Sequence, residues 1–463
     1  MKVAFDALAL KRDYWKKKNW YYHLEMERLA RFFIPPKSSV LEIGAATGDL
    51  LASLKPRKGS GTDISEEMVK HAQKKYPHLG FFGMDAQFLT LQESYEYVIL
   101  SDVIGFLHDI QKVFTNLHHV TSPRSRIIIT SYNYLWEPLV EIAQFLGLKM
   151  PEPPRNWVSR LDVENFLYLA GFEVIKRGHH ILFPFYIPLL SRFLNRYLGK
   201  LPLFTRLSLV YYVIARPNPR PLKAPASVSV IVPARNEAGN IEPLVKRTPK
   251  MGSHTEIIFV EGHSRDNTLE KIREAKKKYP LIDIKIYVQD GAGKGDAVRK
   301  GFNRAKGDIL MILDADITVP PEELIKFYEA LRERKGEFIN GSRLVYPLEK
   351  YSMRFLNLLG NKFFSIMFSW LLDQRMKDTL CGTKVLWRED YEQIKRERAF
   401  FGEFDPFGDF DLLFGAAKLH MKIIDLPIRY QERTYGKTNI SRFAHGWLLL
   451  KMCVFAMRKI KFI

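Results

Sequence analysis

Residues 307–316 constrain the fold of this chain more than any other stretch, because they form an apolar run that ends in two acids. Short runs of β-favouring apolar residues are typical of strands buried on both faces of an α/β sheet. Side chains alternate along a strand, so Asp314 and Asp316 point to the same face. Open α/β sheets bind ligands at the carboxyl ends of their strands. The stretch therefore predicts an α/β fold with a candidate ligand site at Asp314 and Asp316.

These two carboxylates repel each other unless a cation lies between them. Mg²⁺ or Mn²⁺ would suit the position, because both prefer oxygen ligands and share their other positions with substrate phosphates. The alternative is a solvated acidic turn before a helix that starts at Pro320 and Pro321. An Asp-x-Asp pair is common, so the neighbouring segments must decide between the two interpretations.

The length of the chain limits the number of its domains, and its net charge limits the kinds of partner that it favours. The chain has 463 residues, enough for two or three domains, and a net charge of +20. That charge favours anionic partners: nucleotide sugars, lipid phosphates, an anionic membrane surface or nucleic acid.

The two cysteines, Cys381 and Cys453, are too few for a disulfide framework and fit a reducing cytosol. We expect no signal peptide and no transmembrane helix, since no uncharged apolar run reaches about 18 residues.

The first half of the chain repeats a strand-then-acid pattern. Residues 39–50 read as a strand, a glycine-containing turn and a helix start, which lets the backbone approach a ligand closely. Asp63 ends the next strand, about 20 positions after the turn, where an acid accepts hydrogen bonds from ribose hydroxyls. Asp85 and Asp102 follow the next two predicted strands.

Together these segments resemble the class I S-adenosylmethionine-dependent methyltransferases over roughly the first 180 residues. The family motif Glu/Asp-x-Gly-x-Gly-x-Gly stands here with alanine in place of its middle glycine. The resemblance implies a Rossmann-like fold that binds S-adenosylmethionine, with a ribose acid, an adenine-side pair and a strand end that faces the methyl acceptor. The implied cofactor-binding residues are Glu42, Gly44, Ala46, Gly48, Asp63, Asp85, Ala86 and Asp102.

No side-chain signature names the methyl-transfer chemistry. His108 is a candidate general base on an alcohol, although a histidine in such a place more often caps or packs. Two alternatives for this half stay open. The domain binds another nucleotide, or it is a non-catalytic module that binds nothing.

Residues 181–214 are rich in aromatic residues and proline, with arginines and lysines among them. This composition predicts either an amphipathic tail lying in a membrane interface or a packing subdomain over the sheet. Four prolines in residues 217–226 predict a semi-rigid linker. The predicted domains are therefore 1–216 with the tail, the linker 217–226, and 227–463.

In the second domain, four consecutive predicted strand ends carry polar or glycine clusters that a nucleotide diphosphate could bridge. These clusters resemble those of glycosyltransferase family 2, and most nearly the polyprenyl-phosphate sugar synthases, over residues 227–440. The resemblance implies a GT-A nucleotide-sugar fold and a GDP- or UDP-linked sugar donor. The implied donor-binding residues are Pro233, Asn236, Glu237, Glu261, Ser264, Asp266, Lys294 and Gly295.

The same resemblance places Asp314 and Asp316 on the metal, Arg343 near the diphosphate, and Asp411 on the helix before the final strand. Residues 378–384 and 433–439 would bind the acceptor or its phosphate. The implied acceptor residues are Asp378, Lys384, Arg433 and Asn439.

Two apolar stretches with basic residues, 353–372 and 447–463, predict helices that lie in a membrane interface, with core packing or an oligomer contact as the alternative.

The leading interpretation is a bifunctional enzyme: two doubly wound α/β domains with interfacial helices, peripheral on the cytoplasmic face of the membrane. It transfers a sugar with inversion to a polyprenyl phosphate and methylates a second substrate. Alternatively the acceptor is a soluble or glycan alcohol, with Asp411 or Asp409 as base. An RNA methyltransferase is disfavoured because no RNA-binding module is present. Oligomeric state stays open.

Overall fold

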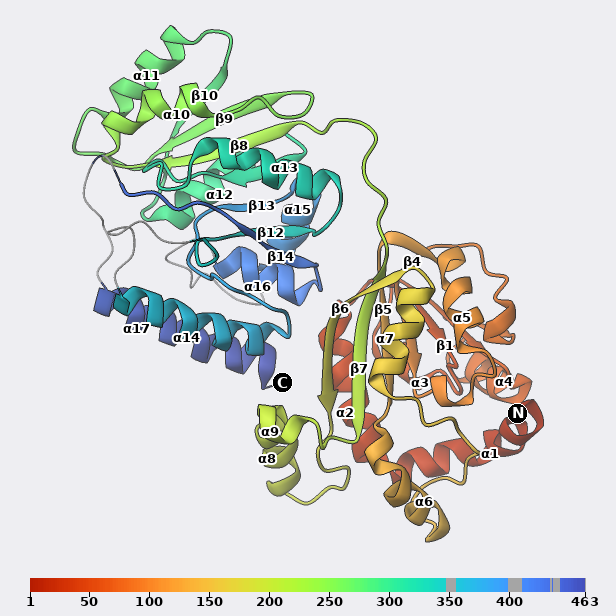
Figure 1. The fold of residues 1–463 in the computed structure, drawn as a ribbon. Helices are drawn as coiled ribbons and strands as arrows, with labels where there is room; N and C mark the ends of the chain where they lie inside the picture. The colour runs from red at the N-terminus through yellow and green to blue at the C-terminus, as the bar shows by residue number, and fades with distance from the viewer. Residues whose placement is uncertain (347–354, 399–409, 434, 436–441, 463) are drawn as a thin grey trace. The chain divides into compact units, whose positions relative to one another are not determined.

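The protein is described here by a computed structural model that covers residues 1–346, 355–398, 410–433, 435 and 442–462. The chain forms two compact units, one built on residues 1–219 and the other on residues 220–461 (Figure 1). Each unit contains a seven-stranded sheet, which confirms the predicted class of two α/β domains.

The first unit is a sheet in the order β3-β2-β1-β4-β5-β7-β6. The first five strands in this order run parallel, and β7 is antiparallel to both of its neighbours. Its strands are β1 Ser39–Ile43, β2 Lys58–Asp63, β3 Gly80–Gly83, β4 Tyr95–Ser101, β5 Thr121–Tyr132, β6 Phe172–His180 and β7 Val210–Pro217. Its helices are α1 Lys2–Lys18, α2 Trp20–Phe33, α3 Asp49–Ser53, α4 Glu66–Lys75, α5 Ile110–Asn116, α6 Glu137–Phe145, α7 Arg160–Leu169, α8 Leu190–Arg196 and α9 Pro202–Thr205.

Two apolar layers hold this sheet in place. Alternate side chains of β1 and β4 enter opposite layers: Leu41 and Val98 pack on one face, Val40 and Ile99 on the other. Such two-sided burial explains why the strands read as continuous apolar runs. Helix α7 begins at Arg160, and Ser159 with Asp162 forms a capping box at its start.

The end of the predicted amphipathic tail is not interfacial, which corrects the expectation for residues 181–214. Residues 210–214 belong to β7, a fully buried strand between β5 and β6, and Pro217 of the predicted linker ends that strand. The physical reason is the uninterrupted apolar run from Leu209 to Ala215, which is long enough to be buried on both faces. The exposed part of the segment is limited to the stretch before β7.

The second unit has the sheet order β10-β9-β8-β11-β13-β12-β14. β10, β9, β8 and β11 are parallel, β13 is antiparallel to β11 and β12, and β12 pairs in parallel with β14. Its strands are β8 Val228–Ala234, β9 Thr255–Glu261, β10 Asp283–Val288, β11 Ile309–Ile312, β12 Phe338–Ser342, β13 Lys384–Trp387 and β14 Ile423–Pro427. Its helices are α10 Ile241–Arg247, α11 Thr268–Lys278, α12 Lys294–Arg304, α13 Leu324–Arg332, α14 Phe355–Leu372, α15 Arg388–Arg396, α16 Phe410–Lys418 and α17 Arg442–Ala456.

Helices α14 and α17 correspond to the two predicted interfacial stretches, and they pack beside each other within the second unit (Figure 1). Apolar side chains on both stay exposed, among them Ile366 and Trp447. None of the helices in the described part of the chain is long and apolar enough to cross a membrane.

Candidate functional sites

The glycine-containing turn after β1 is held in backbone conformations that favour glycine. Gly44 and Gly48 have φ angles of 75° and 78°, and Ala46 has a φ of 45°. A Cβ added to Gly44 would lie 2.6 Å from Val103 Cγ2, and one added to Gly48 would lie 2.5 Å from Phe81 Cζ. The two glycines are therefore required by backbone conformation and by close packing.

The acid at the end of β2 is tied to this turn. The Ala46 amide donates to Asp63 Oδ2 at 2.8 Å, and the Ser65 amide donates to Oδ1 at 2.9 Å. Burial raises the pKa of Asp63, although both amides favour its ionised form. Asp85, after β3, accepts a hydrogen bond from the Gln87 amide at 2.8 Å and caps a short 3₁₀ turn that begins at Ala86.

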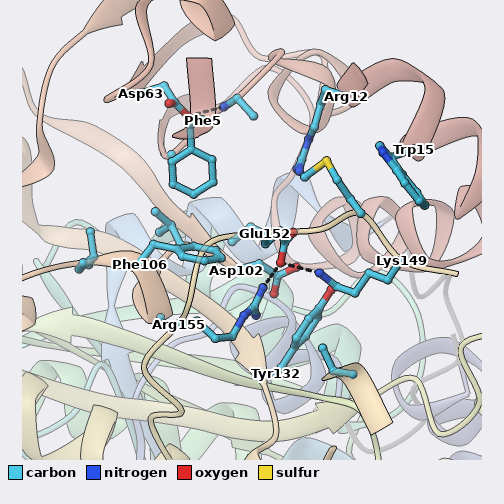
Figure 2. Close-up of a pocket in the computed structure, with 18 of the residues that line it drawn as sticks. Phe5, Arg12, Trp15, Asp63, Asp102, Phe106, Tyr132, Lys149, Glu152 and Arg155 are labelled. Carbon is cyan, nitrogen blue, oxygen red and sulfur yellow. Dashed lines mark hydrogen bonds and ion pairs between the residues drawn. The ribbon is translucent and has the colours of Figure 1, made fainter. Parts of the chain in front are cut away.

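A cavity of about 960 Å³ opens beside these residues (Figure 2). Its volume is at the upper end of the range for small-molecule sites, which is roughly 300–1,000 Å³. Six of the eight predicted cofactor residues line it: Gly44, Ala46, Asp63, Asp85, Ala86 and Asp102. The other two shape the turn instead. Glu42 is buried and accepts a hydrogen bond from the Leu51 amide at 3.0 Å, and Gly48 precedes α3.

Much of the cavity wall comes from segments that the motifs did not indicate. Helices α1 and α2 supply Arg12, Trp15 and Tyr22, and β5 supplies Tyr132. Residues 11–34 are basic and aromatic, and this composition was the one signal that the sequence offered for them. Helix α1 in fact begins nine residues before that stretch, at Lys2.

A compact charged group forms another part of the wall. Glu152 pairs with both Lys149 and Arg155, as Figure 2 shows. The Arg155 guanidinium lies over the rings of Tyr132 and Phe106, with Cζ 4.5 Å and 4.7 Å from their centroids. Burial disfavours the ionised form of Glu152, but the two cations outweigh it and lower its pKa.

Asp102 lies at the end of β4 with a φ of 55° and faces the cavity. The Tyr22 hydroxyl donates to its Oδ2, whereas its Oδ1 is buried and has no hydrogen-bond partner among the described residues. Burial raises the pKa of Asp102 and, more strongly, that of Tyr22. His108 also lines the cavity, in an exposed position just before α5.

In the second unit, the loops after β8 and β9 are joined by hydrogen bonds that involve predicted donor-binding residues. The Asn236 amide donates to Ser264 Oγ at 3.0 Å, and the Ala238 amide donates to Asp266 Oδ2 at 3.4 Å. The Ser264 amide donates to Glu261 Oε1 at 2.5 Å. Pro233 lies within β8, paired with Val260 of β9. The structure therefore brings this part of the predicted set together.

Asp314 follows β11 and forms an ion pair with Lys294, the first residue of α12, at 2.7 Å. Burial opposes the ionisation of Asp314, but Lys294 outweighs it, so the pKa of this carboxyl is lowered. Gly382 packs against the pair so closely that an added Cβ would lie 2.0 Å from Asp314 Oδ2. Gly295, next to Lys294, is buried in the first turn of α12.

Arg433 joins two of the predicted acids. Its Nη2 lies 2.6 Å from Asp316 Oδ2, and its Nη1 lies 2.8 Å from Glu237 Oε1. Asp316 also accepts a hydrogen bond from Thr318 Oγ1 at 2.8 Å through Oδ1. Arg433, which was expected to bind the acceptor, thus pairs with Asp316, which was expected to bind the metal. It also pairs with Glu237, which was expected to bind the sugar donor.

Arg343, after β12, makes a bidentate pair with Asp378: Nε to Oδ2 is 2.7 Å and Nη2 to Oδ1 is 2.8 Å. Asp378 is fully buried, which by itself would raise its pKa, but Arg343 holds that pKa below its ordinary value. Lys384 is also fully buried, and its ammonium donates to Asn340 Oδ1 at 3.0 Å and to the Cys381 carbonyl at 2.5 Å.

Asp411, on α16, is largely buried and accepts a hydrogen bond from Arg398 Nε at 2.7 Å. Asn439 and Asp409 lie outside the described residues. Within the described part of the chain, no group of three or more His, Cys, Asp or Glu side chains is arranged to hold a metal ion. A metal bound by Asp314 and Asp316 would therefore need further ligands from elsewhere, such as phosphate oxygens of a substrate.

Comparison with known proteins agrees with the two units. The family described as Methyltransferase domain matches residues 15–177, and Glycosyl transferase family 2 matches residues 229–394. The chain therefore carries a methyltransferase domain followed by a family 2 glycosyltransferase domain, as the sequence motifs predicted.

Among curated proteins, the chain is similar to the dolichol-phosphate mannosyltransferase of Pyrococcus furiosus, with 30% identity over 48% of this chain and 64% of that protein. It is 40% identical to the Saccharomyces cerevisiae dolichol-phosphate mannosyltransferase over 23% of this chain and 41% of that protein. The chain thus covers less than two thirds of the length of each of these relatives.

Among solved structures, the chain is similar to a Thermotoga maritima protein described as a SAM-dependent methyltransferase, possible histamine N-methyltransferase. The identity is 17%, the TM-score is 0.37, and the match covers 47% of this chain and 99% of that one. A SAM-dependent methyltransferase from Aquifex aeolicus has 18% identity and a TM-score of 0.32, covering 45% of this chain and 97% of that one.

Proposed function

We propose that the chain is a bifunctional enzyme. Its second unit transfers a sugar from a GDP- or UDP-linked donor to a polyprenyl phosphate, and its first unit transfers a methyl group from S-adenosylmethionine. The observation that carries the glycosyl transfer is the cluster of acids and cations around Asp314 and Asp316, in which four predicted ligand segments meet. Both curated relatives described above are named dolichol-phosphate mannosyltransferases, which favours a polyprenyl phosphate as the acceptor.

The cations of this cluster suit the charge that the reaction develops. When the bond between the anomeric carbon and the diphosphate breaks, negative charge moves onto the leaving diphosphate. Lys294, Arg343 and Arg433 each hold a carboxylate in the structure, and a bound diphosphate would offer them an equivalent partner. A phosphate acceptor is already ionised at neutral pH, so this reaction needs no general base.

If a bound diphosphate pairs with these cations, their carboxylate partners become free to bind a divalent metal. Asp314 and Asp316 supply the carboxylate oxygens that Mg²⁺ and Mn²⁺ prefer, and Mg²⁺ commonly takes only one or two carboxylates beside substrate phosphates. When bound, the metal would neutralise phosphate charge. Lys294 lowers the pKa of Asp314, which favours the ionised carboxylate that a metal needs.

S-adenosylmethionine fits the first unit's cavity for three reasons. The turn at Gly44 has no side chain between the backbone and the cavity, Asp63 offers carboxylate oxygens at the end of β2, and Asp85 stands at the next strand end. Asp63 would accept the ribose hydroxyls and Asp85 would lie at the adenine side.

A membrane surface is the place where a polyprenyl phosphate is available. Exposed apolar residues on α14 and α17, together with the net charge of +20, favour peripheral binding to anionic lipid. We propose that the chain works at the cytoplasmic face.

The glycosyl transfer is tested with labelled nucleotide sugars, offered with a mixture of polyprenyl phosphates and soluble glycans. The proposal predicts label in the lipid phase for one donor. Label found only in soluble glycans would contradict the lipid acceptor, and would make Asp411 or Asp409 the candidate base on an alcohol. Calorimetric titration with S-adenosylmethionine tests the first unit separately, and absence of binding would make that unit a non-catalytic module.

A further inference from the structure

The cavity of the first unit extends beyond the residues that the cofactor motifs indicate. Beyond the turn and the acids at one end, its wall is formed by aromatic rings, a charged group and apolar residues of α6. We infer that this second part binds the methyl acceptor, and that the acceptor is a lipid-anchored compound whose head group carries a hydroxyl that reaches Asp102. The inference rests on the proposed use of S-adenosylmethionine by this unit.

Two buried polar atoms in the cavity wall define what the head group must offer. Asp102 Oδ1 and Arg12 Nε are both buried, and neither has a hydrogen-bond partner among the described residues. Both residues line the cavity (Figure 2). Buried polar atoms without partners cost free energy, so a ligand that pairs with them gains affinity. Asp102 Oδ1 needs a donor and Arg12 Nε needs an acceptor, which the hydroxyls of a sugar-like head group supply.

Asp102 is placed to take the proton that the reaction releases. The hydroxyl oxygen attacks the methyl carbon of S-adenosylmethionine, an O–C bond forms, and the S–C bond breaks with its electron pair going to sulfur. The hydroxyl proton goes to Asp102 Oδ1. The Tyr22 hydroxyl donates to Oδ2 and so leaves Oδ1 as the atom available for the substrate. Asp102 is then a catalytic residue, a role that the sequence suggested for His108.

The mouth of the cavity favours an acceptor with an apolar chain. Leu139, Ile142 and Phe185 line the cavity and are each about half exposed, so they form an apolar rim. Further along the same two segments, Phe145 is 90% exposed and Leu189 is 88% exposed. Exposed apolar patches of this kind mark binding surfaces.

The occupant of this rim is an anionic lipid bilayer. No acidic residue occurs between Glu173 and Glu237, whereas Arg192 and Arg206 are exposed in the segment that contributes Phe185 and Leu189. Basic and apolar residues on one exposed segment suit an anionic membrane interface. Because the rim leads into the cavity, a lipid-anchored head group would enter from the bilayer without leaving it.

The test uses the full chain with methyl-labelled S-adenosylmethionine. Polyprenyl-phosphate sugars in phosphatidylglycerol vesicles are compared with the matching water-soluble sugar phosphates. We expect label in the lipid phase, and a loss of about 100-fold or more for Asp102→Asn with an unchanged Kd for S-adenosylmethionine. Asp109→Asn is the matched control, since Asp109 caps α5 outside the cavity and asparagine caps equally well. Ile142→Glu should reduce labelling of the lipid but not binding of the cofactor.

Three results would overturn the inference while leaving the cofactor site intact: label only in soluble sugar phosphates, no labelled product although S-adenosylmethionine binds, or a wild-type rate for Asp102→Asn. Absence of S-adenosylmethionine binding by the wild-type chain is a different result, because it would remove the proposed function on which this inference rests.

Discussion

In the first unit, polar atoms face the cavity without partners, whereas in the second unit the predicted ligand-binding charges are paired with one another. Asp102 Oδ1 has no hydrogen-bond partner among the described residues. Asp314, Asp316 and Asp378 each hold a cation. The candidate sites of the two units are therefore arranged differently before any ligand binds. The first unit has a preformed cavity, whereas under the proposed function the second unit exchanges internal ion pairs for a charged ligand.

The second unit's arrangement has a physical reason. If they were unpaired in this partly buried place, the carboxylates at the strand ends would repel one another. The cations from the later loops would do the same. Pairing keeps the cluster stable, and under the proposed function a diphosphate and a metal, which also carry opposite charges, replace the internal partners.

The largest expected effect is the loss of glycosyl transfer in Asp316→Asn. Removing one charge from an oxygen-ligand site should lower the rate by about 1,000-fold or more. The fold should be retained, because Glu237 still holds Arg433. Transfer rates and thermal melting check the two statements. The control is Asp290→Asn, whose side chain is 81% exposed and pairs only with Lys300 among the contacts seen. Full activity of Asp316→Asn in the presence of a chelator would rule out the role.

A large loss of stability is expected for Asp378→Asn. Breaking a buried ion pair leaves Arg343 with an uncompensated charge, which costs about 3–5 kcal/mol in free energy of unfolding. Arg247→Gln breaks the exposed pair with Glu322 and should cost about 1 kcal/mol or less. Urea unfolding of both variants gives the comparison. Equal small losses would show that the Arg343–Asp378 pair is not required by the fold.

A smaller effect is expected for Asp63→Ala in the first unit. Loss of charge-assisted hydrogen bonds to the ribose should weaken S-adenosylmethionine binding by roughly 1.5–3 kcal/mol, or about tenfold to a hundredfold. Glu66→Ala, three residues further on and exposed, is the control. Calorimetry measures both, and an unchanged Kd for Asp63→Ala would count against this site.

A pH dependence of stability is expected from Glu42. Burial raises the pKa of this carboxyl to about 8 in the folded protein, above its ordinary value of 4.5. Between these two pH values the unfolded chain is ionised while the folded chain stays protonated. Its contribution to stability is therefore full below pH 4.5 and is lost as the pH rises to 8.

Glu42→Gln should remove this dependence, because glutamine still accepts from the Leu51 amide. The first unit of the wild type should lose up to about 1.4 kcal/mol more per pH unit than the variant over this range. Calorimetric melting at pH 5 and pH 8 measures the difference. Identical slopes for the two proteins would show that Glu42 ionises normally in the folded state.

Local patterns account for what the sequence predicted correctly. The strand that precedes Asp314, the turn at Gly44 and the acid at Asp63 each depend on a few consecutive residues, so periodicity and spacing located them. The apolar run of β7 was visible too, but its place between β5 and β6 depends on pairing with strands far away in the chain. Composition alone could not distinguish it from the amphipathic residues before it.

Long-range contacts account for what the sequence missed. Arg433 and Asp316 are 117 residues apart, and Tyr22 and Asp102 are 80 residues apart. No local pattern indicates that such side chains meet. Arg12 and Arg155 looked like ordinary basic residues, and only the folded structure places both in the wall of one cavity.

The most direct test of the difference between the two sites is calorimetry of both ligands, with and without a chelator. We expect S-adenosylmethionine to bind the full chain with the same Kd in EDTA as in Mg²⁺, because its cavity is preformed. We expect the nucleotide sugar found to be the donor to bind in Mg²⁺ and to lose most of its affinity in EDTA, because Asp314 and Asp316 then keep Lys294 and Arg433. Equal affinity of the nucleotide sugar in both conditions would contradict the proposed exchange of ion pairs.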